Sequence, residues 1–430
     1  MNGEAERVVK QSLSVDLKQK FVVPLLLNYV YWIIQEAETR GIKTLYFFAR
    51  DGYILHKMAI QICEEEHIPI YCKYLYCSRT SLRMPTYSLI GEEALDLLLM
   101  GGYRVSRKSL LKRAELNKEQ RYAVWKDCGE TFVDEEQLLS HHELEGLRKK
   151  LKQSQVFHNF IIEKSRNTYS SAIGYFRQEG LLDLEKVAIV DSGWTGSMQR
   201  SLRQLLQSAG FQGELFGFYF GMYASPKEAK DGTYLTYYFN QAGKTNDKIL
   251  FCNNLFECLL QAPHEMTVGY RLEGSTYFPQ LALSKNEVNY EKIRVYVQEI
   301  LDIAWELERE KPYPNFRLKM AQQETRLLIK RYMAHPTPEE AEFLGGYLFC
   351  DDVSESYHFK LASPDQTKRL KQHLISHRIW NRLFLKRKDN IQPELYWPYG
   401  TIAFLPKRKQ LWYRWNIYLW ELIRYLKYRR

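Results

Sequence analysis

The sequence has few cysteines, and none stands where a disulfide framework or a metal site would need it. The seven cysteines are scattered over 430 residues, and no Cys-x-x-C pair occurs. An odd, scattered set is typical of reduced thiols in a cytosolic protein. We therefore expect no disulfide framework, no zinc site and a cytoplasmic location.

Long apolar runs are also missing. The first twenty residues are polar and contain no apolar signal core. The longest apolar stretch, residues 21–34, is interrupted by Pro24 and Asn28. A bilayer span needs roughly 20 apolar residues, so this stretch predicts a buried helix and no transmembrane segment.

Net positive charge is scarce outside the C-terminal tail. The net charge is +10, and residues 405–430 carry eight Lys or Arg against one acid, Glu421, which leaves only +3 for residues 1–404. A nearly neutral body excludes a general nucleic-acid-binding surface, and we expect no nucleic-acid partner. Aromatic residues, in contrast, reach 14%. They indicate an aromatic core or surfaces that contact carbohydrate or a membrane interface.

The apolar pattern predicts an α/β fold. Residues 43–49 and 68–78 read as buried strands around a helix at 52–66, which is a β-α-β unit and implies a parallel sheet. Residues 187–191, 214–223 and 234–240 read as further strands, with a helix at 195–209. The expected units are a first part of the core (1–89), a helical insertion or cap (90–182), a second part of the core (183–280), a mostly helical C-terminal region (281–404) and a basic amphipathic tail (405–430).

A polar loop follows the strand at 187–190. Asp191 ends the apolar run, and Thr195, Gly196 and Ser197 open the next helix. Unpaired N–H groups at a helix N-terminus attract phosphate, and a carboxylate beside them can hold sugar hydroxyls or a metal ion. The alternative is an ordinary strand-to-helix turn, capped by a hydroxyl, in which the aspartate binds nearby amides.

A similar loop follows the first strand. Arg50, Asp51 and Gly52 lie between the strand at 43–49 and the helix at 52–66, and Arg79 and Arg83 follow the next strand. The arginine fork binds phosphate oxygens in pairs. The alternative for Asp51 is a turn residue before Gly52.

These two loops resemble a known family. The segment "VAIVDSGWTGSM" resembles the phosphoribosyltransferase signature of an apolar strand, acidic residues and a Thr-Gly-small loop that opens a helix. It departs from that signature because Ser192 stands at the second acidic position and the acid-to-Thr spacing is one residue short. Together with "FFARDGY" and "NNLFECLLQAPHEMTVGY" (253–270), it resembles the polysaccharide phosphoribosyltransferases of capsule and O-antigen loci, which are often fused to a haloacid-dehalogenase-like phosphatase. The resemblance covers roughly residues 20–275 and implies a phosphoribosyltransferase-like core.

The resemblance also implies a reaction and its participants. Such an enzyme moves 5-phosphoribofuranose from phosphoribosyl pyrophosphate to a sugar hydroxyl of a glycan or lipid-linked glycan and releases pyrophosphate. Mg²⁺ is the implied cofactor, and a separate phosphatase that removes the 5-phosphate and further glycosyltransferases are the implied partners. The implied residues are Thr195, Gly196 and Ser197 on the 5-phosphate, with Ser192 and Gly193 in the same loop, Asp191 on the ribose hydroxyls and Mg²⁺, Arg50, Gly52 and Arg79 on the pyrophosphate, and Asp51, then Glu257, then His264 as candidate general base.

Two other functions compete with this one. A haloacid-dehalogenase-like sugar phosphatase has an apolar strand followed by Asp-x-Asp, but Tyr53 stands here where that chemistry needs an acid. A non-catalytic binding protein on the same fold is the second alternative, because fold does not fix function. Glu257 could be a helix residue in a salt bridge, and His264 a loop residue.

The tail predicts a basic amphipathic helix. Trp412, Trp415, Leu419, Leu422 and Leu426 recur at helical spacing, with Lys and Arg on the other faces. Such a helix is typical of membrane-surface binding, here at the inner face of the cell membrane. The alternative is a terminal helix that packs on the body of the protein.

Overall fold

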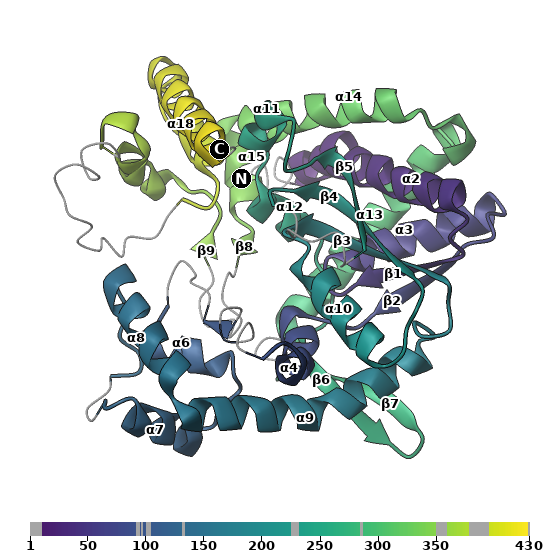
Figure 1. Cartoon of the computed structure of the whole chain (residues 1–430). Helices are drawn as coiled ribbons and strands as arrows, with labels where there is room; N and C mark the ends of the chain where they lie inside the picture. Colours follow the sequence, from purple (N-terminus) through teal and green to yellow (C-terminus); the bar gives the residue numbers. More distant parts are fainter. Residues whose placement is uncertain are drawn as a thin grey trace.

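The computed structural model describes residues 11–91, 95, 98–99, 105–130, 134–224, 232–283, 287–349, 359–377 and 395–428. At its centre lies a parallel sheet with the strand order β2-β1-β3-β4-β5 (Figure 1). The strands are β1 (Thr44–Phe48), β2 (Tyr71–Leu75), β3 (Lys186–Trp194), β4 (Glu214–Met222) and β5 (Thr233–Phe239). The predicted α/β class with a parallel sheet is confirmed, and each expected strand is present.

The central strand β1 is apolar and buried on both sides. In β1, Leu45 and Phe47 point into one core, and Tyr46 and Phe48 into another. Helices therefore cover both faces, as a parallel sheet requires. The first core packs against η1 (Lys18–Val22), α2 (Val23–Arg40), α3 (Gly52–Glu65), α13 (Glu287–Glu310) and α14 (Leu318–Leu328), and the second against α10 (Ser197–Ser208) and the second half of α9 (Gln155–Gln178).

The apolar stretch at 21–34 is a buried helix, as predicted. It forms the end of η1 and most of α2, and every residue from Phe21 to Ile34 except Pro24 is buried. Across the described part of the chain, none of the helices combines the length and the hydropathy needed to cross a membrane.

The predicted helical insertion forms a bundle with its own apolar core. It comprises α6 (Arg107–Lys112), α7 (Lys118–Asp127), α8 (His141–Gln153) and α9, below the sheet in Figure 1. Helix α4 (Arg79–Ile90) contributes Met84 and Tyr87 to that core. Because α9 also packs on the sheet, it connects the bundle to the edge where β2 ends.

The remainder of the chain packs at two places, next to the end of β2 and next to the ends of β4 and β5. A hairpin of β6 (Thr267–Glu273) and β7 (Thr276–Leu281), not predicted from the sequence, stacks Tyr270 on Tyr175 of α9 with ring centroids 4.5 Å apart. The other elements are α11 (Thr245–Leu250), α12 (Asn253–Leu259), η3 (Tyr313–Asn315), η4 (Ile329–Ala334), α15 (Pro338–Gly345), β8 (Leu348–Phe349), β9 (Phe359–Lys360), η5 (Pro364–His373), α17 (Pro398–Ala403) and α18 (Lys407–Tyr428).

Candidate functional site

The sheet has a topological switch point between β1 and β3. The chain runs from β1 outward to β2 and then crosses back to place β3 on the other side of β1. Helices α3 and α10, which follow β1 and β3, consequently lie on opposite faces. In open parallel sheets, ligands bind in the crevice that this arrangement leaves at the carboxyl ends of the strands. Asp51 and Asp191 both lie at that edge.

A hydrogen bond joins the two loops that the sequence singled out. The hydroxyl of Ser192 donates to the carboxylate of Asp51. Burial, followed by the negative charge of Asp51, raises the pKa of Asp191 to about 7. Burial also raises the pKa of Asp51, while the Ser192 hydrogen bond and then the charges of Arg50 and Arg79 act in the opposite direction. The site therefore holds two carboxyl groups whose protons are bound more tightly than in water.

Helix α2 fixes the end of β3 beneath these carboxylates. The buried Tyr29 hydroxyl lies 2.8 Å from the carbonyl oxygen of Asp191 and 3.0 Å from that of Phe218 on β4. Burial, with the charge of Asp191 as the next cause, raises the pKa of Tyr29, so this group remains a neutral hydrogen-bond donor. The position of Asp191 thus depends on packing that begins in the apolar segment at 21–34.

The strand runs further than the sequence predicted. We expected β3 to end at Asp191, but Gly193 and Trp194 still pair with Gly221 and Met222 of β4. A Cβ on Gly193, at φ +124°, would lie 2.2 Å from the carbonyl oxygen of Gly221, so only glycine allows the close pairing of these strands. The turn into α10 is correspondingly short and consists of Thr195 and Gly196.

The N-terminus of α10 lies beside buried positive charge. Ser197 is the first residue of this twelve-residue helix, and its Oγ accepts a hydrogen bond from Nη2 of Arg83 at 3.0 Å. Burial lowers the pKa of Arg83, and the nearby charges of Arg79 and Arg113 lower it further. Arg83, which follows the second predicted strand together with Arg79, thus contacts the start of α10. Arg113, whose charge acts on Arg83, was not expected at the site, because it lies in the helical bundle, far from either loop in sequence.

The loop after β1 and the start of α4 provide two further arginines, Arg50 and Arg79. Arg79, exposed at the start of α4, is near enough to lower the pKa of both Asp51 and Asp191. Arg50 acts on Asp51 in the same way. Gly52 is required by packing rather than by backbone conformation, since a Cβ there would lie 2.9 Å from the carbonyl carbon of Phe47. Thr195 is exposed, and its hydroxyl lies 3.4 Å from that of Ser197.

The two weaker candidate bases flank the carboxylate pair. Glu257, on α12, accepts a hydrogen bond from Nε1 of Trp194 at 2.5 Å. Nε2 of His264 lies 2.7 Å from the Tyr74 hydroxyl, and burial lowers the pKa of the histidine. Glu257 therefore contacts the last residue of β3, while His264 belongs to an aromatic cluster next to the end of β2.

The oxygen donors of the site match the preferences of Mg²⁺. Asp191, with Ser192 next to it, offers hard oxygen ligands, and Mg²⁺ is commonly held by one or two carboxylates together with substrate phosphates. Within the described ranges, no cluster of three or more His, Cys, Asp and Glu side chains is suited to a metal. The donor set therefore fits an ion that arrives with a phosphorylated substrate.

Comparison with models of known protein families gives no match to this chain, and comparison with curated proteins gives none either. The function is therefore argued from the geometry and the chemistry of the site.

Proposed function

We propose that this protein is a Mg²⁺-dependent glycan phosphoribosyltransferase with a phosphoribosyltransferase-like core. It would transfer 5-phosphoribofuranose from phosphoribosyl pyrophosphate to a sugar hydroxyl and release pyrophosphate. The observation that carries this proposal is the Ser192–Asp51 hydrogen bond, which joins the loops after β1 and β3. It brings two carboxyl groups together beside Arg50 and Arg79, and the donor carries phosphate groups on both sides of its ribose.

The polar and charged groups of the site suit the phosphate groups and the ribose of the donor. Ser197, with Arg83 beside it, lies at an unpaired helix N-terminus and suits the 5-phosphate. Arg50 and Arg79 both act on Asp51 and suit the pyrophosphate, and Arg79 also acts on Asp191 and on Arg83. Asp191 suits the ribose hydroxyls and the metal ion. The chain thus offers a partner for every charged part of the donor.

The reaction breaks the bond between ribose C1 and a pyrophosphate oxygen and forms one between C1 and the acceptor oxygen. Pyrophosphate departs with the bonding electron pair, and the acceptor hydroxyl loses its proton to a base. Asp51 is the first candidate, because its raised pKa brings it closer to neutral pH, where general bases are most effective. Mg²⁺, when bound, neutralises charge on the leaving pyrophosphate. Arg50 and Arg79 add fixed positive charge to the same end.

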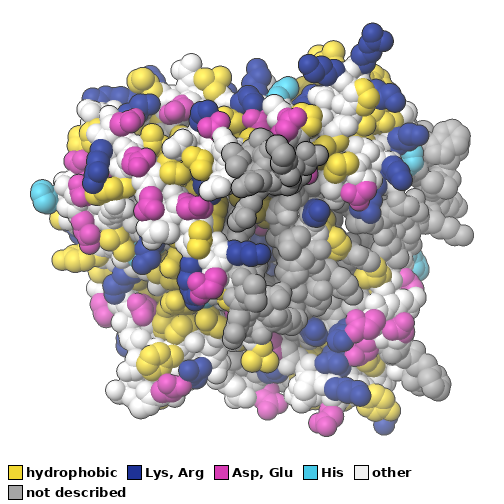
Figure 2. All heavy atoms as spheres, turned by 180° about the vertical axis from the view of Figure 1, so that it is seen from behind, with side chains coloured by type: hydrophobic (Ala, Val, Ile, Leu, Met, Phe, Trp, Pro, Cys, Tyr) yellow, Lys and Arg dark blue, Asp and Glu magenta, His cyan; other side chains and the backbone are white. Residues whose placement is uncertain are grey.

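The C-terminal helix supports a membrane-associated acceptor. Helix α18 exposes Leu411, Trp412, Trp415, Leu419 and Ile423 along one face, and Lys407, Arg408 and Lys409 are exposed at its start. Figure 2 shows hydrophobic and basic side chains side by side at the upper right of the molecule, where the start of α18 projects. A lipid-linked glycan at the inner face of the cell membrane is the acceptor that such a helix would bring within reach.

One feature favours the phosphatase alternative as well. Carboxyl groups at the ends of two adjacent strands also suit metal-assisted phosphate hydrolysis. Tyr53, however, stands two residues after Asp51, where that chemistry needs an acid. Release of orthophosphate from a sugar phosphate would therefore be the signature of that function, and release of pyrophosphate the signature of the transferase.

Calorimetry with phosphoribosyl pyrophosphate tests donor binding. We expect binding with Mg²⁺, loss of binding on addition of a chelator, and strong weakening by Asp191→Ala and Ser197→Ala. Asp302→Ala is the matched control, because Asp302 lies on α13 away from the site. No heat with this donor, together with binding of another sugar donor such as a nucleotide sugar, would overturn the proposal.

A further inference from the structure

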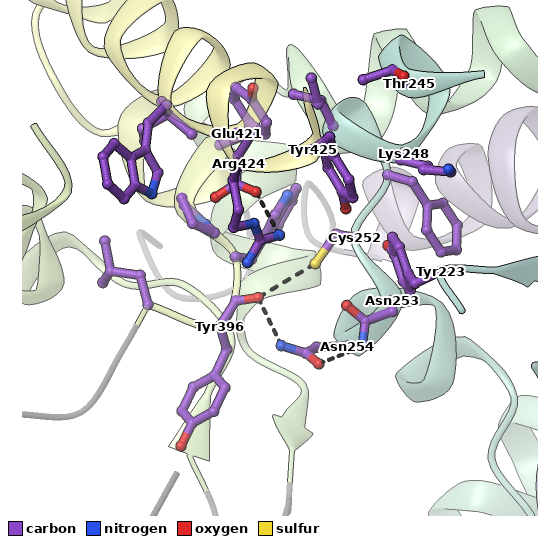
Figure 3. Close-up of a pocket in the computed structure, with 18 of the residues that line it drawn as sticks. Tyr223, Thr245, Lys248, Cys252, Asn253, Asn254, Tyr396, Glu421, Arg424 and Tyr425 are labelled. Carbon is purple, nitrogen blue, oxygen red and sulfur yellow. Dashed lines mark hydrogen bonds and ion pairs between the residues drawn. The ribbon is translucent and has the colours of Figure 1, made fainter. Parts of the chain in front are cut away.

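A large pocket lies at the same edge of the sheet as the carboxylates. Its volume is about 1310 Å³, and it lies between the ends of β4 and β5 and helices α11, α12, α17 and α18 (Figure 3). Sites for drug-sized ligands usually measure about 300–1,000 Å³. The pocket is therefore large enough for a chain of several sugar rings.

The lining combines aromatic rings with amides. Tyr223 and Tyr425 lie with near-parallel rings, their centroids 6.5 Å apart. Asn253 and Asn254 present amide groups to the same space, and the amide of Asn254 also donates to the carbonyl oxygen of Tyr396 (Figure 3). Aromatic faces pack against the C–H faces of sugars, while amides bond to hydroxyls in both directions. This composition suits a carbohydrate better than a lipid tail.

The arginine of the pocket is paired with a carboxylate, while Lys248 of the lining donates to the carbonyl oxygen of Gln241. The guanidinium of Arg424 is 2.6 Å from the carboxylate of Glu421. The Tyr399 hydroxyl, also in the lining, is buried and has no hydrogen-bond partner among the described residues. With Arg424 paired and Lys248 bonded to a backbone carbonyl, both cations of the lining already have polar partners. This favours a polyhydroxyl ligand over a phosphate.

Trp194 separates this pocket from the carboxylates. Its carbonyl oxygen accepts hydrogen bonds from the backbone N–H groups of Tyr223 at 2.9 Å and Ala224 at 3.2 Å. Its ring packs against Tyr223 and Phe251, both in the lining of the pocket, at centroid distances of 5.8 and 5.5 Å. Asp191 precedes Trp194 by only three residues on the same strand. A sugar chain in the pocket would therefore lie next to the donor site.

We propose that this pocket binds the sugar chain of the acceptor glycan. The inference deepens the proposed function and rests on it for the identity of the acceptor. Helix α18 has one face toward the pocket and another toward solvent. Glu421, Arg424 and Tyr425 line the pocket, while Trp415 and Leu419 are exposed on the opposite side. One helix thus lies between the glycan and the membrane to which its lipid carrier belongs.

Saturation-transfer NMR with oligosaccharides released from the source cell's own surface polysaccharide tests this proposal. We expect these sugars to bind the wild-type chain and to lose binding in Asn253→Trp and Thr245→Trp, which fill the pocket with an indole. Asn167→Trp, on the exposed side of α9, is the control and should bind as the wild type does. Thermal unfolding shows whether each variant is folded. If one of the two blocking variants does not fold, the other still tests the pocket.

The outcomes separate this proposal from the proposed function. Sugar binding that is lost in the blocking variants supports the pocket, even if phosphoribosyl pyrophosphate fails to bind and the donor assignment is wrong. Wild-type protein that does not bind the oligosaccharides, or equal binding by all variants, overturns the pocket. In that case donor binding measured on the same samples would leave the transferase proposal standing.

Discussion

The individual residues at the switch point set the pH behaviour of the site. Asp191 has a pKa of about 7 in the folded chain, above the value of about 3.9 for an unperturbed aspartate. A raised carboxyl pKa means that the folded state binds this proton more tightly than the unfolded chain does. The contribution of Asp191 to stability is therefore largest at low pH and falls as pH rises from about 4 to about 7.

Donor binding should have the opposite pH dependence. Mg²⁺ needs the ionised carboxylate, so the affinity for the Mg²⁺ donor complex should increase as pH rises through about 7. Calorimetry over this range measures the trend, part of which comes from the phosphates of the donor. Asp191→Asn should retain only that part and bind more weakly throughout. An identical pH profile in wild type and variant would show that Asp191 does not contribute.

The general base can be identified by comparing two variants. Asp51→Asn should leave donor binding nearly intact, because the amide oxygen can still accept the Ser192 hydrogen bond, and should slow transfer by about 10²–10⁴-fold. Glu257→Gln should change the rate much less, since Glu257 contacts Trp194. Steady-state rates of pyrophosphate release decide between them. A nearly active Asp51→Asn enzyme with a slow Glu257→Gln enzyme would transfer the role to Glu257.

At the scale of elements, the sequence predicts what depends on local pattern. Buried strands without polar residues required a parallel sheet, and the polar residues after β1 and β3 indicated its functional edge. The continuation of β3 through Trp194 was missed because pairing with β4 depends on the close approach of Gly193 to Gly221. Arg113 was missed because it reaches the site only through the fold of the helical bundle. The β6–β7 hairpin and the pocket likewise depend on contacts between segments distant in sequence.

The arginines near the start of α10 give a prediction for the contact between the helical bundle and the proposed phosphate loop of the sheet domain. Arg83→Met and Arg113→Met should each weaken the binding of ribose 5-phosphate, because Arg83 contacts Ser197 and Arg113 adds positive charge near Arg83. A charged hydrogen bond contributes on the order of 1.5–3 kcal/mol, so Arg83→Met should cost roughly tenfold or more. Arg294→Met, on the exposed side of α13, is the control. Unchanged affinity in both site variants would place the 5-phosphate elsewhere.

At the scale of the whole molecule, the tail has two faces. Ile417 is buried and Trp420 lines the pocket, so the expected packing of a terminal helix on the body is present together with the exposed apolar stripe. Of the residues predicted for that stripe, Trp412, Trp415 and Leu419 are exposed and Leu422 is half-buried, while the Leu426 side chain lies outside the described residues. Arg414 is half-buried, contrary to its predicted place on a solvated basic face. Deleting the tail would remove core contacts, so point substitutions are the better test.

Vesicle flotation tests the exposed face of the tail. Replacing Lys407, Arg408 and Lys409 with Gln should weaken binding to anionic vesicles by roughly two orders of magnitude, since each contributes on the order of 1 kcal/mol. Wild-type binding should decrease as salt rises, because salt screens this attraction. Lys319→Gln with Met320→Ser, on an exposed patch of α14, is the control. Equal binding of both variants at low salt would show that α18 does not bind the membrane.

The central claim is that the site transfers phosphoribose and releases pyrophosphate, and ³¹P NMR tests it most directly. The reaction contains the purified chain, Mg²⁺, phosphoribosyl pyrophosphate and lipid-linked glycan from the source cell. The account predicts free pyrophosphate together with a new phosphomonoester signal on the glycan, both absent in Asp191→Ala. Release of orthophosphate alone, or an unchanged donor spectrum with the complete acceptor extract, would contradict it.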